Sequence, residues 1–134
     1  MTSSRGFILR FLGKKRDGMF SALDIKKPGD RQTADRYFDG SGEARLANLR
    51  SILVERGTVT GDEFDAALMQ LQSEGCIAGD ALTTVGVDTH HAEYKAYLMD
   101  AKVKAPKIDK KHGFDQLIAD VDLKQQIELT KRNF

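Results

Sequence analysis

Apolar residues recur every three or four positions between residues 43 and 56. Leu46, Leu49 and Leu53 fall on one face of a helix at this spacing. Gly57 then follows Arg56, and a glycine after a basic residue is a typical helix stop because glycine adopts the left-handed conformation without strain. The pattern predicts a helix that ends at about residue 56.

A second amphipathic stretch follows at once. Thr60 and Glu63 form a Thr-x-x-Glu capping box, in which each side chain accepts a hydrogen bond from the other residue's backbone amide. Gly75 marks the end of this stretch. Its apolar face consists of Phe64, Ala67, Leu68 and Leu71. We therefore predict a helical hairpin over residues 43–75.

The segments after this hairpin carry weaker patterns. Residues 76–88 are too short and too broken by glycine for a long helix, so a loop or a short extended segment is expected. Apolar spacing supports a third helix over residues 89–103. A Lys-rich stretch around Pro106 predicts a linker, and a last amphipathic helix begins at Phe114. At the other end of the chain, Phe7 to Leu12 predicts one or two helical turns.

These elements together predict a mostly α fold: a small bundle of four to five helices with a central helical hairpin and extended basic termini. The expected organisation is a basic N-terminal arm over 1–31, a helical core domain over 32–103, and a linker with a C-terminal helix over 104–134. With 134 residues, 40% hydrophobic and 31% charged, the chain has the composition of one ordinary globular domain.

The net charge of +1 is unevenly distributed. Residues 1–31 carry eight Lys or Arg against three Asp, residues 32–100 carry five against twelve Asp or Glu, and residues 101–134 carry eight against five. Basic ends around an acidic middle predict that the ends face an anionic surface or an acidic neighbouring subunit, or that basic residues solvate flexible termini.

The cysteine content and the apolar runs bear on location. Cys76 is the single cysteine and has no partner for an internal disulfide, which favours a reducing compartment. The apolar run from Phe7 to Leu12 is far shorter than the roughly 20 residues that span a bilayer, and it lacks the cleavage site of a secretory signal. A cytosolic or organelle-internal protein is expected.

The stretch from Leu53 to Phe64 resembles the second half of an EF-hand, the helix-loop-helix calcium motif. Gly57, Val59 and Glu63 match the turn glycine, the strand hydrophobe and the last calcium ligand of that family. Phe64 matches the aromatic residue that opens the exiting helix. The resemblance over residues 46–75 implies a helix-loop-helix of EF-hand type, whereas a plain helical hairpin would share several of these features.

The front of this loop lacks the ligands of that family. Ile52, Val54 and Arg56 occupy the positions of the first three oxygen ligands, and calcium needs six to eight oxygens. We therefore expect a calcium-free loop. The phrase Asp39-Gly40-Ser41-Gly42 also looks calcium-like, but Tyr37 and Asn48 stand where its first and last carboxylates belong.

Candidate chemistry is sparse. Asp88, His90, His91 and Glu93 cluster at the start of the predicted third helix, where a transition metal is conceivable. His90 and Glu93 would share one face of that helix, but no third ligand stands at a recognisable spacing from this pair, and polar residues before a helix are ordinary caps. Cys76 has no catalytic partner in a known order, and phosphate-binding and dinucleotide fingerprints are missing. We expect no metal, no cofactor, no evident small-molecule substrate and no enzymatic activity.

The function expected from these features is structural: a small helical subunit that docks onto protein partners in a larger complex through its terminal arms. The N-terminal arm also suits a membrane surface. The residues expected to contact a partner are Phe7, Ile8, Phe11, Lys14, Lys15, Arg16, Phe114 and Phe134.

Two alternative functions stay open. One is a regulatory light-chain-like module, derived from an EF-hand, that binds a partner helix. The other is a nucleic-acid-binding regulator, which the acidic middle of the chain disfavours because proteins that bind phosphates present basic faces.

Overall fold

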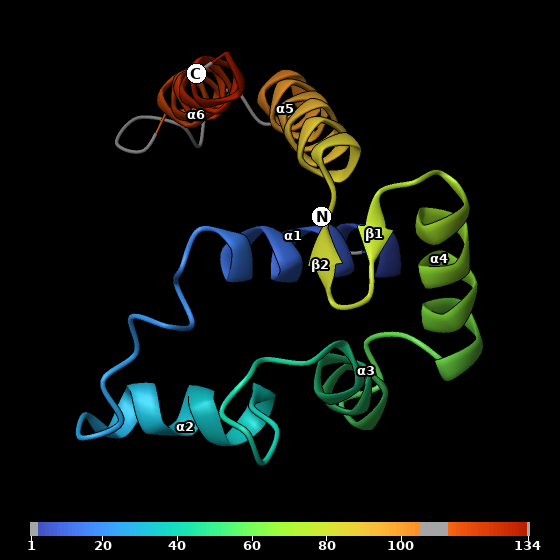
Figure 1. The fold of residues 1–134 in the computed structure, drawn as a ribbon. Coiled ribbons are helices and arrows are strands. Elements are labelled where there is room, and N and C mark those ends of the chain that lie inside the picture. Colours follow the sequence, from blue (N-terminus) through green and yellow to red (C-terminus); the bar gives the residue numbers. More distant parts are fainter. Residues whose placement is uncertain (1–2, 105–112, 134) are drawn as a thin grey trace. The chain divides into compact units, whose positions relative to one another are not determined.

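The structure is a computed structural model that describes residues 3–104 and 113–133. The chain divides into two compact units, Thr2–Val87 and Asp88–Phe134. The described residues confirm the mostly helical fold (Figure 1). Its elements are α1 (Ser4–Arg16), α2 (Pro28–Tyr37), α3 (Leu46–Glu55), α4 (Gly61–Ser73), β1 (Ile77–Ala78), β2 (Ala81–Leu82), α5 (Thr84–Lys104) and α6 (Phe114–Arg132).

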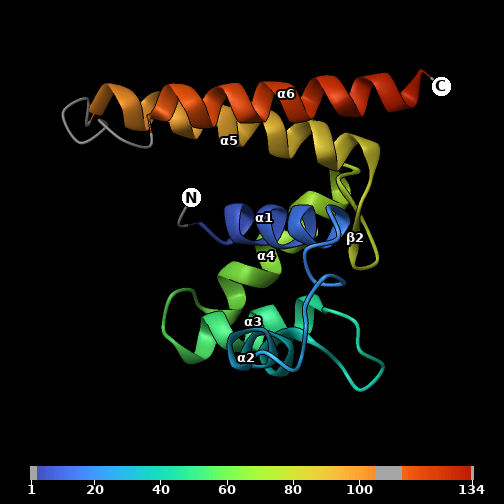
Figure 2. The ribbon, with the colours of Figure 1, turned by 90° about the vertical axis from the view of Figure 1, so that its left-hand side faces the viewer.

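The N-terminal segment is a core helix of the first unit, and this corrects the expectation of an extended arm over residues 1–31. Ser3 caps α1 by accepting a hydrogen bond from the Gly6 amide at 3.1 Å. Ile8, Leu9 and Leu12 are at most 1% exposed, and α1 packs against α3, α4 and β2 (Figures 1 and 2). The apolar side of α1 is buried by its own chain, and its cations lie elsewhere on the helix.

The buried side chains of the first unit form one cluster that α1, α3, α4 and the strand pair share. Its members are Ile8, Leu9, Phe11, Leu12, Ala44, Leu46, Leu49, Leu53, Val59, Phe64, Leu71, Cys76 and Ile77. Burial of this apolar surface is the main force that holds these three otherwise marginal short helices and the strand pair together.

The predicted hairpin is present as α3 and α4. Thr60 Oγ1 accepts a hydrogen bond from the Glu63 amide at 3.1 Å, and Glu63 Oε2 accepts one from the Thr60 amide at 3.4 Å, which completes the capping box. Gly57 has φ of +70° in the turn that ends α3. Leu53 and Phe64 bury the inner faces of the two helices.

Residues 77–82 form a minimal antiparallel strand pair. Ile77 pairs with Leu82 and Ala78 with Ala81, so the expected short extended segment is present in the first half of 76–88. The second half corrects the expectation, because helix α5 begins at Thr84 and not at residue 89. Immediately after it, Gly86 in the first turn of α5 lies so close to the Cys76 carbonyl oxygen that a Cβ atom there would overlap it. This close approach fixes the start of α5 against the strand pair.

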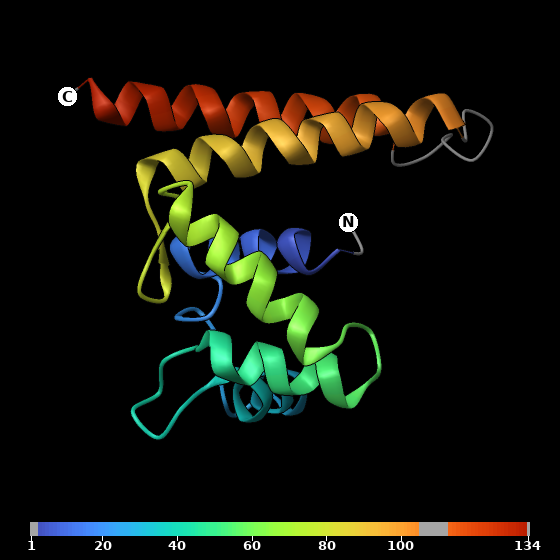
Figure 3. The same cartoon turned by 90° about the vertical axis from the view of Figure 1, so that its right-hand side faces the viewer.

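The second unit contains most of α5 together with α6, which lie side by side and antiparallel (Figures 2 and 3). Among the described residues of this unit, Leu98 and Val121 are buried, at 2% and 5% exposure. The unit boundary at residues 87 and 88 therefore differs from the expected core domain of 32–103. The predicted linker lies almost entirely outside the described residues.

No described helix combines the length and apolar character needed to cross a bilayer.

Candidate functional sites

A surface pocket in the first unit is built from α1, α2, the segment that joins them, and Leu49 of α3. Its cavity measures about 420 Å³. Phe11, Phe20 and Tyr37 form an aromatic triangle in its wall, with ring centroids separated by 5.1, 5.4 and 5.9 Å. Tilted rings at these separations are the favourable geometry for aromatic packing. We call this site the basic aromatic pocket.

The charged residues that line the basic aromatic pocket are all cations. Arg10 and Lys14 stand one turn apart on α1, and Arg36 approaches from α2. No acidic side chain is found among the described lining residues. The pocket is completed by Phe7, Met19, Leu23, Thr33 and Leu49. It therefore combines apolar walls with positive charge.

The pKa of Lys14 records this environment. Burial of the ammonium group lowers the pKa of Lys14 below its usual value, and the neighbouring Arg10 charge lowers it further. Both causes disfavour a proton on Lys14. A partly buried cation beside a second cation in a cleft is a feature of functional sites.

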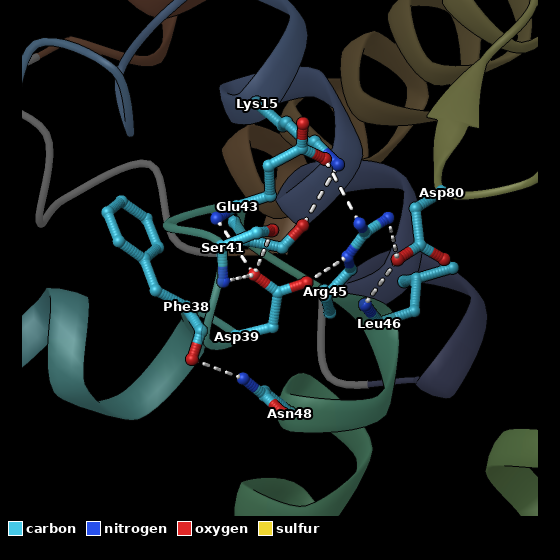
Figure 4. A network of polar contacts seen from close by, with 10 residues as sticks. Lys15, Phe38, Asp39, Ser41, Glu43, Arg45, Leu46, Asn48 and Asp80 are labelled. Carbon is cyan, nitrogen blue, oxygen red and sulfur yellow. Dashed lines mark hydrogen bonds and ion pairs between the residues drawn. The ribbon is translucent and has the colours of Figure 1, made fainter.

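A polar network holds the loop between α2 and α3 (Figure 4). Asp39 Oδ1 accepts hydrogen bonds from the Ser41 hydroxyl, the Ser41 amide and the Glu43 amide, at 2.6, 2.8 and 3.1 Å. Asp39 Oδ2 accepts a 2.7 Å bond from Arg45 Nε. These donors, with the Ser41 hydroxyl first, hold the pKa of Asp39 well below its usual range.

The same network ties the loop to other elements of the first unit. Arg45 also lies 3.7 Å from Asp80 in the turn between β1 and β2. Asp80 accepts a hydrogen bond from the Leu46 amide at 3.4 Å, and Lys15 Nζ donates to the Ala44 carbonyl at 2.9 Å. Lys15 of α1 and Asp80 of the β1–β2 turn thus bond backbone groups at the start of α3 and in its preceding loop, where the helix itself provides no partner.

The calcium-like phrase at residues 39–42 is accounted for by this network. The Asp39 carboxylate turns to backbone amides and to Arg45, as an Asx turn does. No group of three His, Cys, Asp or Glu side chains in the described part of the chain is arranged to hold a metal ion.

A ladder of ion pairs joins α5 to α6 in the second unit. Asp88, Lys95 and Lys102 are spaced by seven residues along α5. Each reaches an opposite charge on α6: they pair with Arg132, Asp122 and Asp115. Lys95 Nζ lies 2.8 Å from Asp122, and Arg132 donates to both oxygens of Asp88 at 3.0 and 3.1 Å. The charges match only in the antiparallel register.

A groove runs beside this ladder, with a cavity of about 530 Å³. Its apolar lining residues are Met99 and Val103 from α5 and Ile118 from α6; Lys95, Lys102 and Asp115 complete it. Met99 is 52% exposed and Val103 is 79% exposed. We call this feature the hairpin groove.

The structure distributes the residues expected to contact a partner among several environments. Ile8 and Phe11 are buried at 0% and 5% exposure, so as contacts for a partner they are corrected: the chain's own core occupies them. Lys15 is held by the Ala44 carbonyl, and Arg16 is exposed at the end of α1.

The remaining predicted residues divide in the same way. Phe7 and Lys14 do line the basic aromatic pocket, and Phe11 is also among its lining residues. Phe114 is half-buried at the start of α6. Phe134 lies outside the described residues. Sequence reasoning missed Arg36 and Tyr37 in the pocket, because only the fold brings α2 beside α1.

The polar cluster at the start of the third predicted helix lies within α5. Asp88 is engaged by Arg132. The His90 ring stacks on His91 and on Tyr94, with centroid separations of 6.2 and 6.1 Å. This arrangement is one of ring packing along a helix.

Comparison of the chain with family models, with curated proteins and with solved structures gives no match.

Proposed function

We propose that this protein is a non-catalytic assembly subunit whose α5–α6 hairpin packs against a helix of a partner protein. The observation that carries the proposal is the second apolar stripe on α5. Leu98 is buried in the unit's own interface, whereas Met99 and Val103 are more than half exposed. The proposal places the docking surface on the α5–α6 hairpin, whereas the sequence pattern favours the terminal arms.

The exposed stripe has the spacing of a helix-packing seam. Ala92, Ala96, Met99 and Val103 follow one another at intervals of four, three and four residues, and all four are exposed. This is the interval at which residues of a supercoiled helix meet a neighbouring helix. An apolar stripe that extends beyond a helix's own buried interface is typical of a helix that packs against a further element.

The charges around the hairpin groove favour a protein partner. Lys95 and Lys102 are already neutralised by Asp122 and Asp115. A nucleic acid would have to compete with those carboxylates for the two lysines, and its binding relies on phosphate neutralisation. An apolar helix instead gains from burial of Met99 and Val103 without disturbing either pair.

Site-specific photo-crosslinking of the full-length chain in its native cells tests this proposal. A benzoylphenylalanine residue replaces Val103 in the groove, or Met69 on α4 as the control. Met69 is a comparable control because it is 69% exposed and does not line the groove. We expect one defined cross-linked protein band from position 103 that is weak or missing from position 69.

A charge substitution distinguishes a second copy from a different protein. Met99→Lys places an ammonium group in the groove, and Met69→Lys is its matched control. If the partner is a second copy, sedimentation of the purified chain shows a dimer that Met99→Lys dissociates and Met69→Lys preserves. A monomer at all concentrations, together with identical cross-links from positions 69 and 103, would contradict the proposal.

A further inference from the structure

The basic aromatic pocket is lined by three cations that are not neutralised by acidic side chains of the described residues. No ion pair or side-chain hydrogen bond links Arg10, Lys14 or Arg36 to another described residue. Some other arginines of the same unit are paired: Arg5 meets Glu74 at 2.7 Å and Arg50 meets Asp65 at 2.8 Å. The pocket therefore gathers three cations without an internal counter-charge.

We propose that this pocket binds a small organic anion with an apolar body, such as an aryl or short acyl carboxylate or phosphate monoester. The anionic head would meet Arg10, Lys14 and Arg36, and the apolar body would lie against Phe11, Phe20 and Tyr37. The inference is independent of the proposed assembly role, because the pocket lies in the first unit and the hairpin groove lies in the second.

The head-group chemistry follows from the kinds of cation present. The planar guanidinium groups of Arg10 and Arg36 offer paired N–H donors that match the two oxygens of a carboxylate or phosphate. Lys14 adds a point charge. Because burial and then the Arg10 charge lower the pKa of Lys14, an anion between Lys14 and Arg10 would stabilise the charged lysine and relieve the repulsion between the two cations.

The body chemistry follows from the walls and the size of the cavity. The half-buried rings of Phe20 and Tyr37 and the exposed side of Met19, at 54% exposure, offer an apolar surface to a ligand, with the buried Phe11 ring packed behind them. A cavity of about 420 Å³ lies in the lower part of the usual range of about 300–1,000 Å³ for small-molecule sites. It suits one ring or a short acyl chain.

Titration of the isotope-labelled full-length chain by NMR tests this proposal with four probes. Phenyl phosphate carries both ligand features, and octanoate carries the acyl form of the same chemistry. Inorganic phosphate has the head alone, and phenol has the ring alone. We expect saturable shifts at pocket residues with phenyl phosphate or octanoate, and binding at least about tenfold weaker for inorganic phosphate and for phenol. The stronger of the first two distinguishes an aryl from an acyl ligand.

Two arginines of α2 provide a matched pair of variants. Arg36→Gln removes a pocket cation, whereas Arg31→Gln removes an exposed arginine that does not line the pocket. We expect Arg36→Gln to weaken phenyl phosphate binding about 10- to 100-fold, as loss of a charge-assisted hydrogen bond does. Arg31→Gln should leave it unchanged.

A third variant addresses the apolar wall without touching the core. Met19→Ala trims an exposed lining residue, and it should weaken phenyl phosphate more than inorganic phosphate. Equal effects of Arg31→Gln and Arg36→Gln would overturn the proposal, since they would show general attraction of anions to surface cations. Shifts that stay linear for all four probes would overturn it as well.

Discussion

Replacement of Ile8 by alanine tests whether α1 belongs to the core of the first unit. Ile8 is 0% exposed, whereas Ile25, in the turn before α2, is 63% exposed. The same substitution at the two positions removes the same three carbon atoms from opposite environments. Ile25→Ala is therefore the matched control for Ile8→Ala.

The expected cost follows from burial. Three buried carbon groups contribute roughly 2.4 kcal/mol of transfer free energy at about 0.8 kcal/mol each, and the cavity left behind adds to this. Buried isoleucine-to-alanine changes cost about 2–5 kcal/mol in total. For a unit of this size a loss of about 3 kcal/mol lowers Tm by roughly 12–24 °C. Ile25→Ala should change the free energy of unfolding by less than about 0.5 kcal/mol.

Urea unfolding followed by far-UV circular dichroism measures both variants. The Ile8→Ala midpoint should fall with an unchanged slope, because only the stability of the folded state changes. A free arm would tolerate the substitution. Equal midpoints for the Ile8→Ala and Ile25→Ala variants would refute the placement of α1 in the core.

Three further predictions concern caps and charges. The folded-state pKa of Asp39 is lowered below the unfolded value of about 3.9. Between these two pKa values the unfolded chain binds more protons than the folded chain, so the stability that Asp39 contributes above pH 4 should fall as the pH falls. The urea midpoints of wild type and Asp39→Asn should therefore converge in acid. Thr60→Ala should lower the free energy of unfolding by about 0.5–2 kcal/mol through loss of the N-cap, while Thr58→Ala in the same loop should not, and a larger effect at Thr58 would contradict the capping box. In the ladder of ion pairs, Lys95→Asp and Asp122→Lys should each lower Tm, and the double variant should recover part of the lost Tm. The interaction free energy of the two side chains should be below about 1 kcal/mol because the pair is exposed. If calorimetry shows that the two losses simply add in the double variant, the pairing is excluded.

The α3–α4 hairpin could be predicted from the sequence because its signals are local. The capping box lies within four residues, and the apolar spacing that precedes Gly57 fits one helix face. Both signals are independent of distant parts of the chain. The two observed helices, Leu46–Glu55 and Gly61–Ser73, lie within the expected hairpin of residues 43–75.

The role of α1 could not be predicted in the same way. Its apolar spacing was visible, but three cations in its last turn made the segment resemble a solvated arm. Whether Ile8 faces a core depends on α3, α4 and β2, which lie far along the chain. Helix α2 gave no periodic signal, because Ala34 is its one buried residue.

The basic aromatic pocket was accessible only in part. Arg10 and Lys14 stand one helical turn apart, a signal present in the sequence, and Phe7 and Phe11 share that stretch. Arg36 joins them through the packing of the first unit, so its contribution required the fold. The ladder of ion pairs between α5 and α6, by contrast, follows from the seven-residue spacing of Asp88, Lys95 and Lys102 in the sequence. It could have been predicted by aligning α6 antiparallel to α5 and comparing their charges.

The contact between Gly86 and the Cys76 carbonyl has an evolutionary consequence. Any side-chain carbon at position 86 would push the start of α5 away from the strand pair, whereas exposed positions such as Met69 accept most residues at little cost. As versions of this chain diverge, we expect glycine 86 to persist after most of the surface has changed. The spacing of that glycine from a small buried residue at position 76 would then serve as a mark of common ancestry.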